Sequence, residues 1–178
     1  RPIIIAAVKA QNDYLKQLTR WPTTTDFWHN CREQVAKQFP QLIDDVTSWR
    51  QHALYFGLVQ AGYTQNEAKH HAQLAYKAFA DARSNIIVSD NVLALLKALK
   101  TRFKIIAITN GNVDVEQFNL KGYFDLVLMA GRDGKAKPNR ELLKLAAQHF
   151  NLNLENILHV GDSLDTDVQG ANNAGCMS

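Results

Sequence analysis

Apolar residues recur at helical spacing through the first half of the chain, which is otherwise rich in polar residues. Residues three or four positions apart share one face of a helix, so this spacing predicts amphipathic helices from residue 1 to about residue 83. The recurring positions after Trp49 are Leu54, Leu58, Ala61, Ala68, Ala72, Ala75 and Phe79.

Three local signals place the ends of these helices. The stretch TQNE, Thr64 to Glu67, has the form of a capping box, in which each side chain bonds the other residue's backbone amide. A helix should therefore begin there. Pro22, Pro40 and the polar stretch TTTD at 23–26 interrupt the pattern and predict about four helices joined by short turns.

From about Val88 the pattern changes to short apolar runs that alternate with amphipathic segments. Such alternation is typical of a parallel sheet with right-handed crossover connections, and hence of an α/β fold. We expect helices at 91–102, 112–124 and 139–152, and strands at 103–109, 125–130 and 156–161. The segment 81–90, DARSNIIVSD, is the expected linker between the helical half and the sheet half.

Each expected strand leads into a polar stretch. The three stretches are AITNGN at 107–112, GRDGKAKP at 131–138 and GDSLDTD at 161–167. Because the carboxyl ends of parallel strands lie at one edge of a sheet, Thr109, Lys137 and Asp162 should converge there.

The chemistry of these residues suits a phosphate ester. Thr109 offers a hydroxyl, and the amides of Asn110 and Gly111 lie in a turn where an anion is favoured. Lys137 offers a compact positive charge, and Asp162 offers the hard oxygen ligand that Mg²⁺ prefers. Together these residues predict a phosphoryl-transfer site.

Taken singly, each residue also has a purely structural interpretation. Thr109 could cap a helix, and Lys137, with Pro138 expected at the first helical position, could be solvated. Asp162, Asp165 and Asp167 could cap a helix or stabilise its dipole. The occurrence of polar groups at three successive strand ends favours a functional site, but we keep Asp165 as a cap or surface charge.

Composition narrows the class of protein. The 178 residues are 46% hydrophobic and carry a net charge of +3, with Lys and Arg scattered along the chain. This favours neither nucleic-acid nor membrane binding. The longest apolar run, PIIIAAV, is too short for a membrane span, and we expect a cytoplasmic protein. Cys31 and Cys176 lack metal-ligand spacing and are expected as reduced structural thiols.

Other residues with ligand chemistry have a simpler interpretation. His159 lies in the third expected strand and is interpreted as a core histidine. His70 and His71 are adjacent on a helix, face different ways and are a poor metal pair. Trp49 is expected to pack in the helical half, with contact to an aromatic substrate as the alternative.

The ordered stretches TNGN, KAKP and GDSLDTD resemble motifs two, three and four of the haloacid dehalogenase (HAD) superfamily. Within it, the chain is most similar to the YigB-type phosphatases, which act on flavin mononucleotide (FMN) and related riboflavin-pathway phosphates. That likeness rests on AITNGN, AGRDGKAKP, LHVGDSLDTDVQGA and, in the helical half, DVTSWR at 45–50.

The resemblance implies a role for each matching residue. Thr109, helped by the Asn110 amide, would bind the transferring phosphoryl group. Lys137 would hold the charges of the nucleophile and the phosphoryl oxygens together. Asp162 would coordinate Mg²⁺, and Asp167 would support the metal shell or orient Lys137.

The resemblance also implies the domains and the reaction. Residues 1–85 would form a mobile cap, and residues 86–178 a Rossmann-like core that lacks its first and last strands in this sequence. The DxDxT/V motif would precede residue 1, so these residues alone should be inactive. The intact protein, a monomer or dimer, would hydrolyse a small phosphate ester through an aspartyl-phosphate. FMN and 5-amino-6-(5-phosphoribitylamino)uracil are the implied substrates.

Two alternatives remain open. A hydrolytic dehalogenase would share the fold and the covalent aspartate but need no metal. A non-catalytic binding module would keep the fold without the nucleophile, and the residues before residue 1 would distinguish it from an enzyme.

Overall fold

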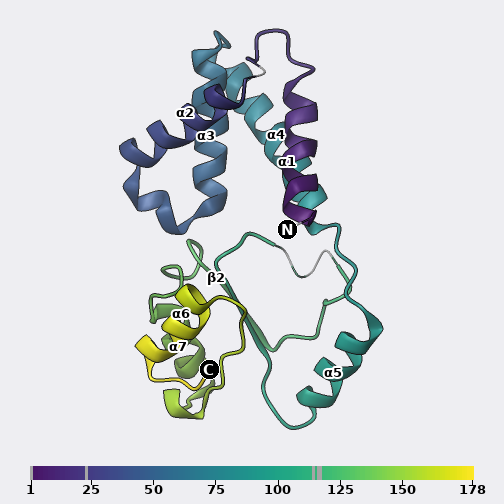
Figure 1. Cartoon of the computed structure of the whole chain (residues 1–178), viewed down its shortest axis with the longest axis vertical. Coiled ribbons are helices and arrows are strands. Elements are labelled where there is room, and N and C mark those ends of the chain that lie inside the picture. The colour runs from purple at the N-terminus through teal and green to yellow at the C-terminus, as the bar shows by residue number, and fades with distance from the viewer. Residues whose placement is uncertain (1, 23, 114, 116–117) are drawn as a thin grey trace. The chain divides into compact units, whose positions relative to one another are not determined.

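The computed structural model describes residues 2–22, 24–113, 115 and 118–178 (Figure 1). The chain divides into two compact units, which we call the helical unit and the α/β unit. The helical unit comprises residues 1–88 and 113–121, and the α/β unit comprises residues 89–112 and 122–178. None of the described helices is both long enough and apolar enough to cross a bilayer.

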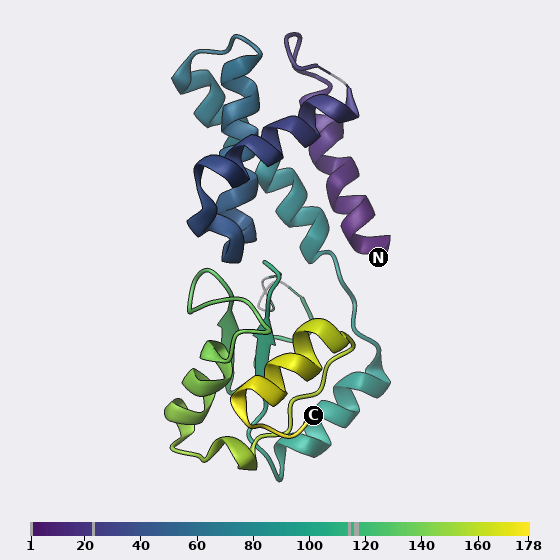
Figure 2. The same ribbon diagram turned by 60° about the vertical axis from the view of Figure 1, so that its left-hand side comes forward.

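Within its described residues, the helical unit contains four α-helices, as the apolar spacing predicted. They are α1 (Pro2–Leu15), α2 (Thr25–Gln38), α3 (Val46–Gln60) and α4 (Gln65–Ser84), with a short 3₁₀ helix, η1 (Pro40–Asp44), before α3. Helix α4 packs along both α1 and α3, and α2 packs on α3 (Figures 1 and 2). Because α4 continues to residue 84, the first part of the expected linker is helical.

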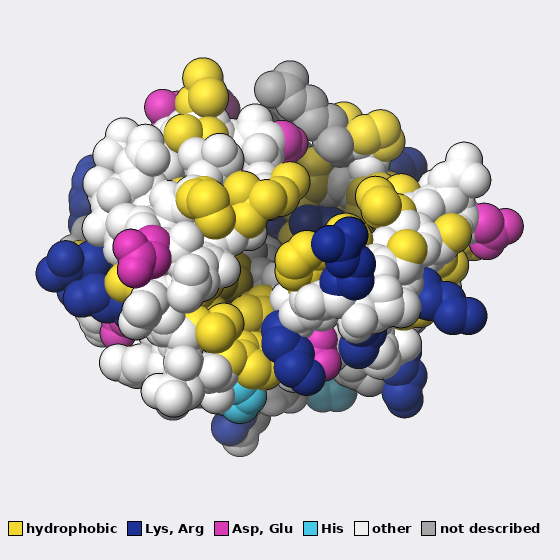
Figure 3. All heavy atoms as spheres, turned by 90° about the horizontal axis from the view of Figure 1, so that it is seen from below, with side chains coloured by type: hydrophobic (Ala, Val, Ile, Leu, Met, Phe, Trp, Pro, Cys, Tyr) yellow, Lys and Arg dark blue, Asp and Glu magenta, His cyan; other side chains and the backbone are white. Residues whose placement is uncertain are grey.

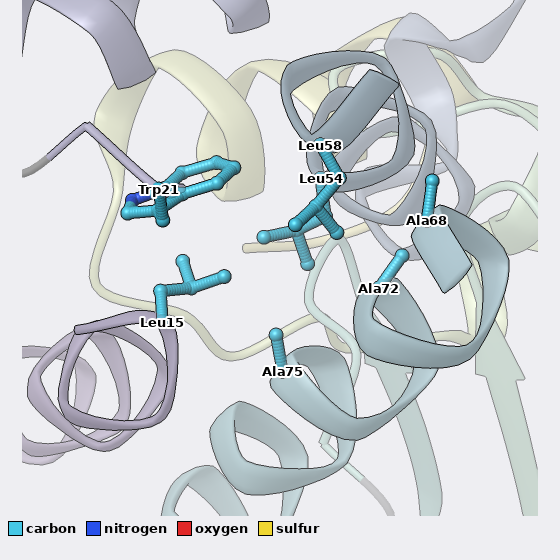
Figure 4. Close-up of a cluster of buried hydrophobic side chains, with 7 residues drawn as sticks. All are labelled: Leu15, Trp21, Leu54, Leu58, Ala68, Ala72 and Ala75. Carbon is cyan, nitrogen blue, oxygen red and sulfur yellow. The ribbon is translucent and has the colours of Figure 1, made fainter. Parts of the chain in front are cut away.

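The core of the helical unit pairs large side chains with the small residues of α4. Alanines on one face of α4 let the neighbouring helices approach closely, and leucines and a tryptophan fill the space between them. The buried cluster in Figure 4 consists of Leu15, Trp21, Leu54, Leu58, Ala68, Ala72 and Ala75. Five of the apolar positions that the spacing indicated therefore form this core.

Side-chain caps begin two of these helices. The predicted box is present: the Thr64 amide donates to Glu67 at 2.8 Å, and the Glu67 amide donates to the Thr64 hydroxyl at 3.4 Å. Asp45 caps α3, where its Oδ1 accepts from the amides of Thr47 and Ser48 at 3.1 and 2.9 Å. Such caps satisfy amides that the first helical turn leaves unpaired.

Strands β1 (Ile106–Thr109) and β2 (Leu126–Met129) form a parallel pair in the α/β unit. Its helices are α5 (Asp90–Lys100), α6 (Glu141–Phe150) and α7 (Gln169–Ala174), with short helical turns η3 (Leu154–Asn156) and η4 (Leu164–Val168). Leu142 and Ala146 of α6 pack against Leu128 of β2, while Leu143 packs with Ala171 and Ala174 of α7. The arrangement confirms the predicted α/β fold.

The third expected strand, at 156–161, is present as a single parallel bridge between Leu158 and Met177. The His159 amide donates to the Met177 carbonyl at 2.8 Å, and the Met177 amide donates to the Ile157 carbonyl at 3.0 Å. A regular β-strand needs a neighbour with which its hydrogen-bond ladder continues beyond one pair. The side chains of this stretch are also not buried, because Leu158 and Val160 remain 61% and 83% exposed. The prediction of a regular strand was therefore wrong.

Two further expectations in the α/β half need correction. The described residues of the helix expected at 112–124 form turns, and residues 114, 116 and 117 lie outside the described residues, as does Thr23. The Asn119 side chain bonds both the amide and the carbonyl of Val88, at 2.9 and 2.7 Å, which fastens this turn to a segment distant in the sequence. Pro138 is not at a first helical position, because α6 begins three residues later at Glu141.

The charged surface agrees with the sequence pattern. On the face in Figure 3, Lys and Arg side chains lie in several separate groups, with Asp and Glu between them. A continuous basic stripe is the usual footprint of a nucleic-acid-binding surface, and this face does not carry one.

Substitution of Leu58 tests the importance of the core in Figure 4. Leu58 is fully buried, so Leu58→Ala should lower the free energy of unfolding by about 3 kcal/mol through lost burial and the cavity left behind. Leu74 on α4 is 37% exposed, so Leu74→Ala should cost well under half as much. Urea denaturation compares the two variants, and equal costs would contradict the assigned core.

Candidate active site

Lys137 lies at the centre of a buried polar cluster at the end of β1. Its side chain is 8% exposed, and Nζ donates to Asp167 Oδ1 at 2.6 Å and to the Ile108 carbonyl at 2.9 Å. His159 Nε2 lies 3.5 Å from Nζ, and because an ammonium has three donors, one N–H is left beyond the bonds to Asp167 and Ile108. Lys137 is thus a held cation and not a solvated surface residue.

The Asn110 side chain holds the backbone of Lys137. Its Oδ1 accepts from the Lys137 amide at 2.8 Å, and its Nδ2 donates to the Lys137 carbonyl at 2.8 Å. This pair of bonds ties the loop after β1 to the loop that carries the lysine. Sequence reasoning considered only the backbone amide of Asn110, so it missed this positioning role.

Thr109 ends β1, and its Oγ1 accepts from the Gly111 amide at 2.9 Å. The Gly111 amide, expected to face an anion, is therefore engaged within the loop. Among the described residues no acceptor takes the Thr109 hydroxyl hydrogen, which could therefore be donated to a ligand. The Thr109 carbonyl accepts from the Ala130 amide at 2.9 Å, which fixes the end of β1 against the chain that follows β2.

Asp167 is a buried carboxylate with both oxygens engaged. Oδ1 accepts from Lys137 and lies 3.0 Å from His159 Nε2, and Oδ2 accepts from the Ser163 amide at 3.2 Å. Burial acts to raise the pKa of Asp167, but the hydrogen bonds of Lys137 and His159 and the lysine charge outweigh it and lower the pKa to about 2. These contacts favour the interpretation that Asp167 orients Lys137.

Asp162 is exposed and lies between Gly161 and Ser163, which both border Asp167. Within the described residues, the Asp162 carboxylate accepts no hydrogen bond from the chain. Asp165 is also exposed, and the Ser163 hydroxyl caps the turn that carries it. Ser163, rather than any of the three aspartates, therefore caps this turn.

The residues around Asp162 offer few protein ligands for Mg²⁺. Among the described residues, no three His, Cys, Asp or Glu side chains lie close enough together to hold a metal ion. Asp162 can supply one hard oxygen ligand, and Mg²⁺ commonly keeps several waters beside one or two carboxylates. A Mg²⁺ held here would therefore have Asp162 as its protein ligand and water at most of its other positions.

His159 is the residue whose place in the cluster sequence reasoning missed. Its side chain is 10% exposed, as expected of a core histidine, but its ring bonds Asp167 and lies beside Lys137. His159 and Gly161 are two positions apart on an extended stretch, so they share a face. The alternation of His159 and Gly161, together with the space that Gly161 leaves for Asp167, could have indicated that His159 faces this cluster.

The structure brings together the stretches 108–111 and 159–167 around Lys137. Trp49 belongs to the helical unit, where its Nε1 donates to the Arg32 carbonyl at 3.3 Å. In the same unit, His71 bonds the Tyr14 hydroxyl at 2.8 Å. The buried ammonium of Lys137 thus bonds the carbonyl of Ile108, the residue before Thr109, and the carboxylate of Asp167, which also accepts from the amide next to Asp162.

Comparisons with known proteins point in one direction. The family model described as haloacid dehalogenase-like hydrolase matches residues 1–175. The 5-amino-6-(5-phospho-D-ribitylamino)uracil phosphatase YigB of Escherichia coli is 40% identical over 144 residues, which are 81% of this chain and 60% of that protein. The pyrimidine 5′-nucleotidase YjjG of Escherichia coli is 34% identical over 106 residues, 56% of this chain and 47% of that protein.

Among solved structures, a 2-haloacid dehalogenase from Pseudomonas syringae pv. tomato matches with a TM-score of 0.94 and 28% identity. The match covers 99% of this chain and 77% of that one. The chain thus spans half to three fifths of the length of the two curated relatives, and about three quarters of the solved structure.

Gly161 offers a direct test of the cluster's packing. A Cβ built at Gly161 would lie 2.2 Å from Asp167 Cγ, so Gly161→Ala should displace the carboxylate and lower the free energy of unfolding by about 2 kcal/mol. Val160→Ala, at an adjacent position that is 83% exposed, is the control and should change it by less than about 0.5 kcal/mol. Equal stability of the two variants would contradict this packing.

The depressed pKa of Asp167 predicts a pH effect on stability. A pKa that is lower in the folded state stabilises the fold above the unfolded pKa, and this contribution is lost as pH falls from about 4 toward 2. The fall from 3.8 to about 2 corresponds to about 2 kcal/mol.

Urea denaturation of the wild type and of Asp167→Asn across this pH range measures the contribution. The wild type should lose about 2 kcal/mol more than the variant. Parallel pH profiles would show that Asp167 does not carry the effect.

Proposed function

The chain belongs to the haloacid dehalogenase-like hydrolases, and from this membership we propose that the full-length protein is a Mg²⁺-dependent phosphatase acting on a small phosphomonoester. The names of the two curated relatives, both of which act on phosphate esters, support the reaction class.

The proposal rests mainly on the burial and the hydrogen bonds of the Lys137 ammonium. Its ammonium is withdrawn from water and held between Asp167 and the Ile108 carbonyl at the end of β1. A lysine fixed in this way presents its ammonium group to one place, which suits the neutralisation of phosphoryl oxygens. A solvated lysine would have to be ordered again in every reaction cycle.

The remaining residues have complementary roles in this proposal. The Thr109 hydroxyl donates to a phosphoryl oxygen, and Asn110 holds the lysine loop in place. Asp162 would hold Mg²⁺, which when bound neutralises charge on the transferring group. The nucleophilic carboxylate, which forms the aspartyl-phosphate, would come from a part of the full-length protein outside these residues.

For the substrate we propose 5-amino-6-(5-phosphoribitylamino)uracil or FMN, because the name of the 40% identical relative gives the first of these. Residues 1–85 would act as the mobile cap that selects the substrate and excludes water. The ring of Trp49 is a candidate for contact with an aromatic substrate, although the Arg32 guanidinium lies over it at 4.5 Å.

A second candidate function is favoured by one specific observation. The solved structure with a TM-score of 0.94 is a 2-haloacid dehalogenase. Such an enzyme would use the same fold without a metal ion. The exposed carboxylate of Asp162, which accepts no hydrogen bond from the described residues, favours the phosphatase, because binding of a hydrated cation would give it a function.

Matched substitutions test the phosphatase. Lys137→Ala should lower kcat with FMN or the uracil phosphate by about 100-fold or more, because one preorganised charge is lost. Lys135→Ala, in the same loop but exposed, should leave kcat within about twofold. Asp162→Asn should raise the Mg²⁺ concentration needed for half-maximal rate, while Asp165→Asn should not. Steady-state kinetics on the full-length protein gives all four values.

The same assay separates the alternatives. Release of chloride from 2-chloropropionate in excess chelator, without phosphate release from any ester, would establish the dehalogenase instead. Absence of both activities in a folded protein would favour a non-catalytic module. If Lys137→Ala and Lys135→Ala retain equal activity, the site assignment fails whatever the substrate.

A further inference from the structure

A polar residue interrupts the buried stripe of α1 in the helical unit. The stripe consists of Ala7, Gln11 and Leu15, and Gln11 is fully buried. Its Oε1 accepts from an Arg50 guanidinium nitrogen at 2.9 Å. Its Nε2 has no hydrogen-bond partner in the described part of the chain. A buried amide donor that lacks an acceptor costs about 1–3 kcal/mol, so such a group calls for an explanation.

Arg50 is the second unusual group in this place. Its guanidinium lies 3.9 Å from the centre of the Phe79 ring, and burial, together with the nearby charge of Arg32, lowers the pKa of Arg50 to about 10. The group is still a cation at neutral pH. Across the described residues, neither arginine forms an ion pair with a carboxylate, although buried charges in proteins are normally paired.

The covalent geometry of Gln11 places its free donor beside this charge. Nε2 and Oε1 are bonded to the same carbon, so the unpartnered N–H lies next to the guanidinium that Oε1 contacts. Arg32 and Arg50 are both half-buried, so their side chains are partly open to solvent, whereas Gln11 is not. Two cations and one amide donor therefore lie close together, and no carboxylate among the described residues pairs with either cation.

We propose that Arg50, Arg32 and Gln11 form a binding site in the helical unit for an oxyanion, the phosphate or carboxylate group of a small molecule. One oxygen of the anion accepts from Gln11 Nε2, and another accepts from the guanidinium of Arg50, whose planar donors match such groups. The charge of Arg32, which now opposes that of Arg50, becomes favourable once the anion is bound. The proposal is independent of the phosphatase activity, because it uses none of the residues around Lys137.

A purely structural role for Arg50 explains less. Packing on Phe79 and the bond to Gln11 would account for where the side chain lies. They would leave the Gln11 donor unsatisfied and two like charges together in a half-buried place. An anion resolves both features at once.

Calorimetric titration of the full-length protein with inorganic phosphate, and separately with malonate, tests the site. We expect saturable binding that Arg50→Met weakens at least tenfold and that persists in Lys137→Ala, where the other candidate anion site has lost its charge. Arg20→Met is the matched control, since Arg20 is exposed and donates to the Gly62 carbonyl elsewhere in the same unit. A preference between the two anions tells whether the natural ligand is a phosphate or a carboxylate compound.

Gln11→Glu keeps the test decisive if Arg50→Met fails to fold. The new carboxylate would occupy the place of the anion beside Arg50, so this variant should lose anion binding and gain about 2–4 °C in Tm. Binding that is equal in Arg50→Met and Arg20→Met, no binding of either anion to the wild type, or a lower Tm for Gln11→Glu would each overturn the proposal.

Discussion

The candidate site depends on one buried ion pair, that between Lys137 and Asp167. Removing two charges from water is expensive, and their attraction compensates only when the remaining donors and acceptors are also satisfied. Here the Ile108 carbonyl takes a second lysine proton, and His159 and the Ser163 amide bond the carboxylate. The pair and its partners therefore connect the end of β1, the loop that carries Lys137 and the turn before α7. These connections set the positions of Thr109 and Asp162.

Each unit holds a cation removed wholly or partly from water, Lys137 buried and Arg50 half-buried, and the two differ in the groups that contact the charge. Lys137 is matched within the chain by a carboxylate and a carbonyl, so its site is complete before any ligand binds. Arg50 is matched by an aromatic ring and one amide oxygen, and the nitrogen of that same amide lacks a partner among the described residues. The first arrangement would be preorganised for the proposed reaction, whereas the second would gain its missing partner from the proposed external anion.

The sequence predicted most of the helical unit, because its elements depend on local signals. Periodic apolar positions such as Leu54 and Ala72 are buried, and the capping box at Thr64 begins α4. Prediction was weaker where partners are distant. The stretch at 156–161 needs a neighbouring strand to form a ladder, and the turns before Gly122 depend on how Asn119 bonds Val88.

The same distinction explains what was predicted of the site. Lys137 and Asp162 were identified from residue type and from their positions after expected strands, although the stretch before Asp162 forms only a single bridge. The bonds of the Asn110 side chain to Lys137 and of His159 to Asp167 join residues eight or more positions apart, so the sequence alone does not specify these partners. A tungstate-soaked crystal of the full-length protein is the most direct test of the central claim. The account predicts tungstate about 3 Å from Lys137 Nζ and Thr109 Oγ1, and an ion bound only away from both atoms would contradict it.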